Sequence, residues 1–263
     1  VNSVAFSPDG RYALTGSSDD TAKLWEVATG REVRSFEGHV GSVNSVAFSS
    51  DGRYALTGSW DYTAKLWEIA SGREVRSLEG HLSSVSSVAF SPDGRYALTG
   101  SWDDTAKLWD VASGRELRTF AGHSERVRSV AFSPDGRYAL TGANGGELKL
   151  WEVAGGREIR SFKGHVVTVR SVAFSPDGRY VLTASTDTAR LWEVDSGREL
   201  RSFEGHSGFV STVAFSPDGR YALTGSWDDT AKLWEVEIGR QTRSFEGHLN
   251  SVSSVAFSRD GRF

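Results

Sequence analysis

The sequence predicts an all-β fold of six similar units and the start of a seventh, and two repeated dipeptides are the evidence. A Gly-His pair places its histidine at His39, His81, His123, His165, His206 and His248. A Leu-Trp pair repeats in step with it, with tryptophans at Trp25, Trp67, Trp109, Trp151, Trp192 and Trp234. The spacing of the histidines is 42 residues, with one interval of 41. Such a period is typical of paired-helix solenoids or of four-stranded blades, so the residues within each unit must decide.

Each unit contains segments suited to four short strands, and the third unit serves as the example. Residues 87–91 read Ser-Val-Ala-Phe-Ser, a Ser-Pro-Asp-Gly turn follows, and residues 95–99 read Arg-Tyr-Ala-Leu-Thr. Proline suits the first central position of a turn, and aspartate and glycine tolerate the remaining ones. We expect a third strand at 105–109, a turn at 113–114 and a fourth strand at 116–120. Because no apolar stretch is long enough for a helix, four strands per unit are favoured.

The four strands are expected to differ in burial, which should fall from the first to the fourth. The first strand alternates apolar and small residues, as expected for an inner strand pressed between neighbouring units. Residues 115–120, Arg-Glu-Leu-Arg-Thr-Phe, are charged, which suits an outer edge that must not pair with other chains. A unit of this kind cannot bury its faces alone. The sequence therefore predicts a β-propeller of four-stranded antiparallel blades.

The repeats predict a single domain over residues 1–263. The units are 1–42, 43–84, 85–126, 127–168, 169–209 and 210–251, with a partial unit at 252–263. Both ends fall inside a repeated unit and the chain has no methionine, so we expect it to be a piece of a longer protein. Six units could close a ring, but residues 252–263 would then duplicate the inner strand that residues 1–7 supply. We favour a seven-bladed parent ring, with six-bladed closure as the alternative.

Composition excludes several classes of protein. Hydrophobic residues make up 38% of the chain and charged residues 24%, as in ordinary globular domains. The formal net charge of −4 is too small to indicate a nucleic acid or an anionic membrane as a partner. The chain has no cysteine, which excludes disulfides and thiolate metal sites and fits a cytoplasmic location. No apolar run is long enough to cross a membrane.

The units resemble the WD-repeat family, from the Gly-His pair at the start of the motif to the Leu-Trp-Glu or Leu-Trp-Asp at its end. Only Trp109-Asp110 has the literal Trp-Asp pair, and the other five units read Trp-Glu. The resemblance implies a buried tetrad in each blade, made of the histidine, a threonine of the second strand, a turn aspartate and the tryptophan. The four complete tetrads would be His39, Thr57, Asp61 and Trp67; His81, Thr99, Asp103 and Trp109; His165, Thr183, Asp187 and Trp192; and His206, Thr224, Asp228 and Trp234.

Two units depart from this pattern. In the fourth, residues 143–147 read Ala-Asn-Gly-Gly-Glu, which leaves His123, Thr141 and Trp151 without their aspartate unless Asn144 takes its place. We therefore expect the fourth blade to be the least stable locally. In the fifth, the turn that contains Asp187 is one residue shorter, which explains the interval of 41. Drift in a stable array explains both changes, and the alternative is that these turns accommodate a partner.

A histidine beside a hydroxyl and a carboxylate also resembles the arrangement that activates a nucleophile. An enzyme, however, needs one pocket with distinct roles, whereas this set recurs in nearly every unit. All six histidines belong to the repeat, and one per blade does not cluster into a metal site. We therefore expect no catalytic residues, no metal and no cofactor.

The positions that vary between units are the candidates for binding. In related propellers these positions surround the central channel on the top face, where ligands usually bind. The aromatic and basic residues at these positions, which are the types enriched in binding hot spots, are Trp60, Trp102, Trp227, Phe209, Arg126, Arg128 and Arg170. Trp60, Trp102 and Trp227 could instead pack on adjacent loops. As binding residues, the seven would place an aromatic arc beside a basic one, suited to an acidic peptide or another anionic ligand.

These observations favour a non-catalytic scaffold that binds a protein or peptide on its top face. The alternative is a sensor or regulatory arm of a larger signalling protein, with an NTPase, caspase-like or kinase effector domain in the same chain. Nucleic acid is a weaker candidate, because three arginines on a negatively charged chain make a poor phosphate-binding track. A membrane is not expected as a partner.

Overall fold

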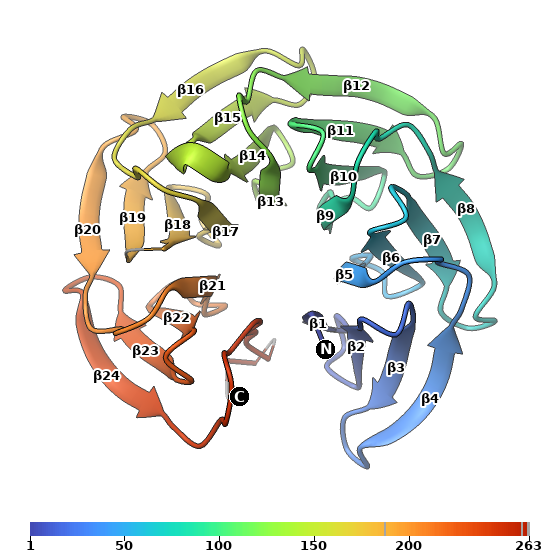
Figure 1. Cartoon of the computed structure of the whole chain (residues 1–263), viewed down its shortest axis with the longest axis horizontal. Coiled ribbons are helices and arrows are strands. Elements are labelled where there is room, and N and C mark those ends of the chain that lie inside the picture. The colour runs from blue at the N-terminus through green and yellow to red at the C-terminus, as the bar shows by residue number, and fades with distance from the viewer. Residues whose placement is uncertain (187, 259, 262–263) are drawn as a thin grey trace.

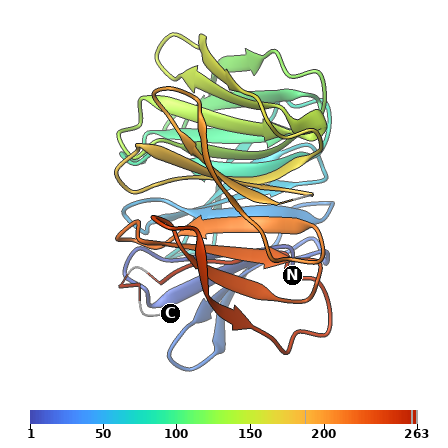
Figure 2. The same ribbon diagram turned by 90° about the vertical axis from the view of Figure 1, so that its left-hand side faces the viewer.

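The computed structural model describes residues 1–186, 188–258 and 260–261. They form six four-stranded antiparallel sheets around a central channel (Figure 1). In every sheet the strand order follows the chain from the channel outwards. The side view shows the sheets of neighbouring blades lying one above another, with their faces turned to each other (Figure 2). No helix in the described part of the chain has the length and apolar character to span a membrane.

The strands are closely similar from blade to blade. The inner strands are β1 (Ser3–Phe6), β5 (Val43–Phe48), β9 (Val85–Phe90), β13 (Val127–Phe132), β17 (Val169–Phe174) and β21 (Val210–Phe215). The second strands are β2 (Tyr12–Gly16), β6 (Tyr54–Ser59), β10 (Tyr96–Ser101), β14 (Tyr138–Ala143), β18 (Tyr180–Ser185) and β22 (Tyr221–Ser226).

The outer half of each blade follows the same pattern. The third strands are β3 (Ala22–Glu26), β7 (Ala64–Glu68), β11 (Thr105–Asp110), β15 (Leu148–Glu152), β19 (Ala189–Glu193) and β23 (Ala231–Glu235). The fourth strands are β4 (Arg31–Phe36), β8 (Glu74–Leu78), β12 (Glu116–Ala121), β16 (Glu158–Phe162), β20 (Glu199–Phe203) and β24 (Arg240–Phe245). A single 3₁₀ turn, η1 (Asn144–Gly146), precedes β15 among the described residues.

The turn between the first and second strands of each blade is stabilised by hydrogen bonds from side chains within the turn. In the third blade, Ser91 donates from Oγ to Asp93 (2.6 Å) and accepts from the main-chain N–H of Tyr96 (2.9 Å). Asp93 also accepts from the N–H of Arg95 (3.0 Å). These bonds satisfy the polar groups of the turn locally, which explains why Ser-x-Asp-Gly recurs in every unit.

The expected order of burial is wrong for the innermost strand. The second strand is the most buried, with Ala97, Leu98 and Thr99 of β10 fully inaccessible, whereas most of β9 is half-buried. The inner strand has one edge on the channel, so it cannot be covered on every side. The second strand lies close to the next blade, and at Gly100 a Cβ atom would stand 2.7 Å from Val130. The charged fourth strands are exposed, as predicted.

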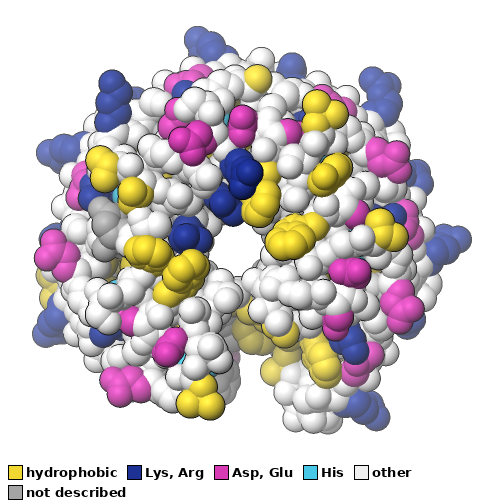
Figure 3. Space-filling view, in the orientation of Figure 1, with side chains coloured by type: hydrophobic (Ala, Val, Ile, Leu, Met, Phe, Trp, Pro, Cys, Tyr) yellow, Lys and Arg dark blue, Asp and Glu magenta, His cyan; other side chains and the backbone are white. Residues whose placement is uncertain are grey.

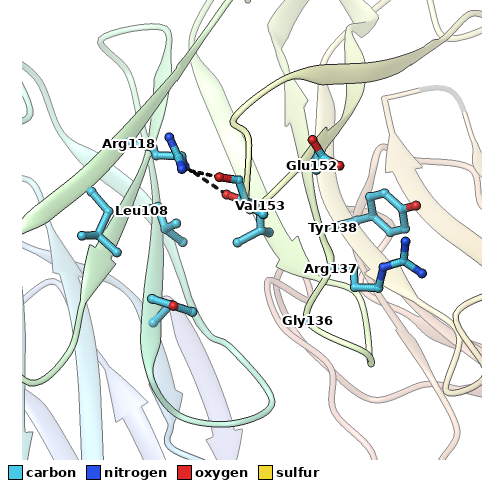
Figure 4. A pocket seen from close by; sticks show the side chains of 10 residues that line it. Leu108, Arg118, Gly136, Arg137, Tyr138, Glu152 and Val153 are labelled. Carbon is cyan, nitrogen blue, oxygen red and sulfur yellow. Dashed lines mark hydrogen bonds between the residues drawn. The ribbon is translucent and has the colours of Figure 1, made fainter.

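Arginines of the fourth strands connect successive blades at the rim. Arg34 donates to the main-chain carbonyls of Ser71 (3.0 Å) and Ala70 (2.9 Å) in the second blade. Figure 4 shows the equivalent bonds of Arg118 to Val153 and Ala154, across a groove of about 420 Å³ between the third and fourth blades. The other arginines of this kind are Arg76 and Arg160.

The described residues of the seventh unit follow β24 without forming a strand. The N–H of Val252 donates to Ser226 (2.9 Å), as that of Val43 donates to Ser17 (2.9 Å), so this segment takes the place of the next inner strand. The space-filling view shows an open notch between this side of the arc and the first blade (Figure 3). The described residues therefore form six complete blades, and closure by a seventh stays a prediction.

Candidate functional site

The histidines and their neighbours form buried networks between the blades. His39 donates from Nδ1 to Asp61 (2.7 Å), its Nε2 accepts from the hydroxyl of Thr57 (2.7 Å), and Trp67 donates from Nε1 to the same hydroxyl oxygen (2.9 Å). The same bonds join His81 to Asp103, Thr99 and Trp109, and His206 to Asp228, Thr224 and Trp234. Such a network leaves none of its polar groups unpaired.

The fifth network is described in part. His165 contacts Thr183 (2.7 Å between Nε2 and Oγ1), and Trp192 donates to the same oxygen (2.9 Å). The aspartate predicted for this set, Asp187, lies outside the described residues.

The fourth network corrects the expectation that this unit lacks a carboxylate or uses Asn144. Glu147 accepts from Nδ1 of His123 (2.8 Å), and Thr141 and Trp151 complete the set. Glu147 occupies the position of a threonine in the other units, and its longer side chain reaches the imidazole. The Gly145-Gly146 turn makes this approach feasible, because at Gly146 φ is +81° and a Cβ atom would collide with the carbonyl oxygen of His165. The reason to expect a weak fourth blade is thereby removed.

The buried networks have the groups of a nucleophile but not its access to solvent. Thr57 is fully buried, and its oxygen is shared between the imidazole and the indole. Burial favours the neutral acid at Asp61, but hydrogen bonds from His39 and Thr63 outweigh it and hold the pKa of Asp61 well below its ordinary value. An ionised, hydrogen-bonded carboxylate orients the histidine and stabilises the interface. Among the described residues, no three His, Asp or Glu side chains gather in a group that could hold a metal ion.

The candidate binding residues lie on the face formed by two kinds of loop: the turns between second and third strands, and the loops that enter the inner strands. We call this the top face. Figure 3 shows hydrophobic and basic side chains gathered around its central opening. On one side of the channel, Trp60 packs against Trp102 (6.1 Å between ring centroids). The guanidinium carbons of Arg126 and Arg128 lie 4.8 and 4.6 Å from the Trp102 ring centroid.

A second cluster uses residues of the fifth and sixth units. Arg170 lies 4.7 Å from the Trp227 ring centroid and 5.9 Å from that of Phe209, and these two rings are 5.2 Å apart. The predicted aromatic and basic arcs are therefore interleaved: the arginines stack on tryptophans instead of forming a separate arc. Stacking holds each guanidinium group in a defined plane and leaves its edge available for hydrogen bonds.

The two clusters face a cavity of about 510 Å³ at the top end of the channel. Arg128 donates from Nε to the side-chain oxygen of Asn144 (2.9 Å), so Asn144 positions an arginine instead of completing a tetrad. In the part of the chain that the structure describes, none of Arg126, Arg128 and Arg170 pairs with a carboxylate.

Exposed aliphatic residues on the same face were not among the sequence candidates. They follow the Gly-His pairs of four loops and are 79–91% exposed: Val40, Leu82, Val166 and Leu249. Trp60 and Trp227 are 51% and 47% exposed. The sequence shows an apolar residue after the histidine in each of these four loops. Whether that residue is exposed depends on the conformation of the loop, which the sequence does not reveal. These side chains add exposed apolar surface to the face that carries the two aromatic clusters.

Comparison with known proteins gives matches along the whole chain. A family model described as IFT122 first beta-propeller matches residues 1–166. The model described as WD domain, G-beta repeat, matches residues 156–193, 197–235 and 239–263. The ribosome biogenesis protein BOP1 homologs of Drosophila willistoni and Drosophila melanogaster are 51% identical over 37 residues. That segment is 14% of this chain and 5% of the length of those relatives, so it amounts to less than one blade.

Proposed function

This chain belongs to the WD-repeat β-propeller family, whose members generally bind proteins, and we propose that it holds an acidic protein or peptide segment against its top face. The observation that carries the proposal is the gathering of exposed apolar side chains on that face. Val40, Leu82, Val166 and Leu249 follow the histidines in the loops that enter the inner strands on this face, and each exposes most of its surface to water. Covering apolar area contributes about 25 cal/mol per Å², so a partner that rests on these loops is favoured.

The charge around the channel supports an acidic partner. Arg126, Arg128 and Arg170 bring three positive charges to the mouth of the channel and make no ion pair within the described residues. The stacked tryptophans exclude water from one side of each guanidinium group, which strengthens its interaction with a carboxylate. Aromatic and arginine side chains in this arrangement are typical of binding hot spots.

Selection from a displayed library of random peptides tests the proposal and requires no candidate partner. We expect peptides enriched in Asp and Glu beside apolar residues. Binding of a selected peptide should weaken by about 2 kcal/mol for each of Trp60→Ala and Trp227→Ala, and by about 1–3 kcal/mol for each of Arg128→Gln and Arg170→Gln. Isothermal titration calorimetry measures these losses.

The matched control is the double variant Val27→Ala and Ile238→Ala. These side chains are about as exposed as Trp60 and Trp227, but they lie in turns between third and fourth strands, at the opposite end of the blades. The control should bind the selected peptides as the parent does. Peptides that bind the Trp60 and Trp227 variants at full strength would contradict the proposal.

A further inference from the structure

Arg128 and Arg170 stand at positions where the other blades use a small polar residue for the fold. In four blades this residue, the second of the inner-strand segment, donates its side chain to the first carbonyl of the next inner strand. Those donors are Asn2, Asn44, Ser86 and Ser211. Arg128 donates to Asn144 instead, and Arg170 makes no side-chain hydrogen bond within the described residues. The fold therefore does not require arginine at either position.

The cavity at the channel mouth is lined by two arginines and by no acidic residue. Nε of Arg170 and Nε1 of Trp102 are both buried and have no hydrogen-bond acceptor among the described residues, and both residues line this cavity. The rest of the lining adds serine and asparagine side chains and no acidic residue. Arg128 and Arg170 therefore bring two positive charges to a cavity whose lining holds no counter-charge, so an anionic ligand is favoured.

The arginines are also held close to one another without a counter-charge. Burial, followed by the charges of Arg170 and Arg126, holds the pKa of Arg128 below its ordinary value, and burial lowers the pKa of Arg170. Both groups nevertheless stay protonated, as arginine does in proteins. Two unpaired guanidinium groups in one partly dehydrated cavity repel each other, and an anion between them relieves that repulsion.

We infer that the mouth of the channel binds a phosphate group in its dianionic form, either free or carried by the bound partner, between Arg128 and Arg170. A phosphate monoester offers three oxygens and a charge close to −2, which matches the charges of two guanidinium groups and their hydrogen-bonding forks. A single carboxylate offers two oxygens and a charge of −1, and would leave one fork unpaired. The inference rests on the proposed function only where the phosphate belongs to a partner that covers the top face.

Titrations at constant ionic strength test the inference. The probes are inorganic phosphate, acetate, a phosphoserine peptide and the same peptide with serine. Calorimetry measures the binding of each probe, and the ³¹P NMR signal reports the binding of those that contain phosphorus. We expect phosphate to bind and acetate not to bind, and the phosphopeptide to bind at least tenfold more tightly than its serine counterpart if the partner carries the group. If only inorganic phosphate binds, the site takes the free anion.

Two double variants and a matched control locate the site. Replacing both residues, as R128Q and R170Q, should weaken phosphate binding at least tenfold, and R128K with R170K should give an intermediate loss because lysine keeps the charge without the fork. The lysine variant keeps the test valid if the glutamine variant unfolds. The control, R53Q with R137Q, removes two arginines that also stack on aromatic rings, at 5.4 and 5.5 Å, but at the opposite end of the blades. It should bind phosphate as the parent does.

Three outcomes would overturn the inference. The first is phosphate binding that is unchanged in R128Q with R170Q, and the second is acetate binding as tight as that of phosphate. The third is a single-stranded oligonucleotide that binds more tightly than the phosphopeptide, which would indicate a phosphodiester backbone as the ligand. Peptide selection that depends on Trp60 and Trp227 while phosphate fails to bind would leave the proposed function intact. If phosphate binds but no peptide is selected, the phosphate site stands and the proposed function fails.

Discussion

The interface between the third and fourth blades and the open edge after the sixth blade carry the same side chains in different surroundings. Phe120 is fully buried and packs on Trp151 at 5.6 Å, whereas its counterpart Phe245 is 40% exposed. His123 is bonded at both ring nitrogens, whereas His248 is exposed and has no partner in the part of the chain that the structure describes. The motif is therefore stabilising only where the following blade supplies the hydroxyl, the carboxylate and the indole.

The largest expected effect contrasts an interior tryptophan with one at the open edge. Trp109 is buried beside the preceding blade, whereas Trp25 of the first blade is only half-buried and has no preceding histidine against it in the described chain. Trp109→Ala should lower the free energy of unfolding by about 3–5 kcal/mol because it leaves a cavity, and Trp25→Ala should lower it clearly less. Urea unfolding measures both values. Equal losses would show that the open edge is as well packed as an interior interface.

Completing the open edge should remove the contrast. Fusing a copy of residues 85–126 after residue 251 places a threonine, an aspartate and a tryptophan where His248 and Phe245 can meet them. Covering one large apolar side chain contributes about 1.5–3 kcal/mol, so unfolding should shift to higher urea concentration. A control fusion that carries alanine at the histidine-bonding threonine and at the tryptophan should gain less. No gain from the intact copy would argue against a seventh blade at this edge.

Removing a single carboxylate should lower the free energy of unfolding by a smaller amount. The loss should be larger at Glu147, inside the array, than at Asp19, in the first blade. Glu147→Ala leaves Nδ1 of His123 without its acceptor and should cost about 1–3 kcal/mol. Among the described residues, Asp19 has no histidine partner and bonds only within its own turn, so Asp19→Ala should cost less. Hydrogen exchange of β14 and β15 measures the loss. Normal protection of these strands in Glu147→Ala would mean that Glu147 does not replace the missing aspartate.

The smallest effect concerns pH. Burial lowers the pKa of His206 and of His123 in the folded chain, although Asp228 and Glu147 oppose the shift. The unfolded chain therefore takes up protons first as the pH falls below about 6.5, and stability present above that pH declines as the pH falls towards the folded values. His206→Gln should flatten this decline, measured as the melting temperature between pH 8 and pH 5. His248→Gln, at an exposed position, should leave the profile unchanged.

The period and the local strand patterns predict the blades from sequence, because each unit repeats the same turn chemistry and alternation. The order of burial was not accessible in this way, since the exposure of β9 depends on the channel that the whole arc creates. Glu147 was missed because its role depends on the conformation of Gly145 and Gly146 and on the reach of one extra methylene. The candidate residues around the channel were identified by their variation, whereas the stacking of Arg128 on Trp102 depends on side-chain conformation.

The rim arginines bear on how such an array changes its length during evolution. Arg34, Arg76, Arg118 and Arg160 donate to main-chain carbonyls of the next blade, so these bonds do not depend on which side chain the next turn carries. A unit that is duplicated or lost by unequal recombination of its coding sequence would meet the same carbonyls at each new junction. Neighbouring units can therefore be copied and exchanged without compensating mutations at the rim, while the loops of the top face remain free to diverge.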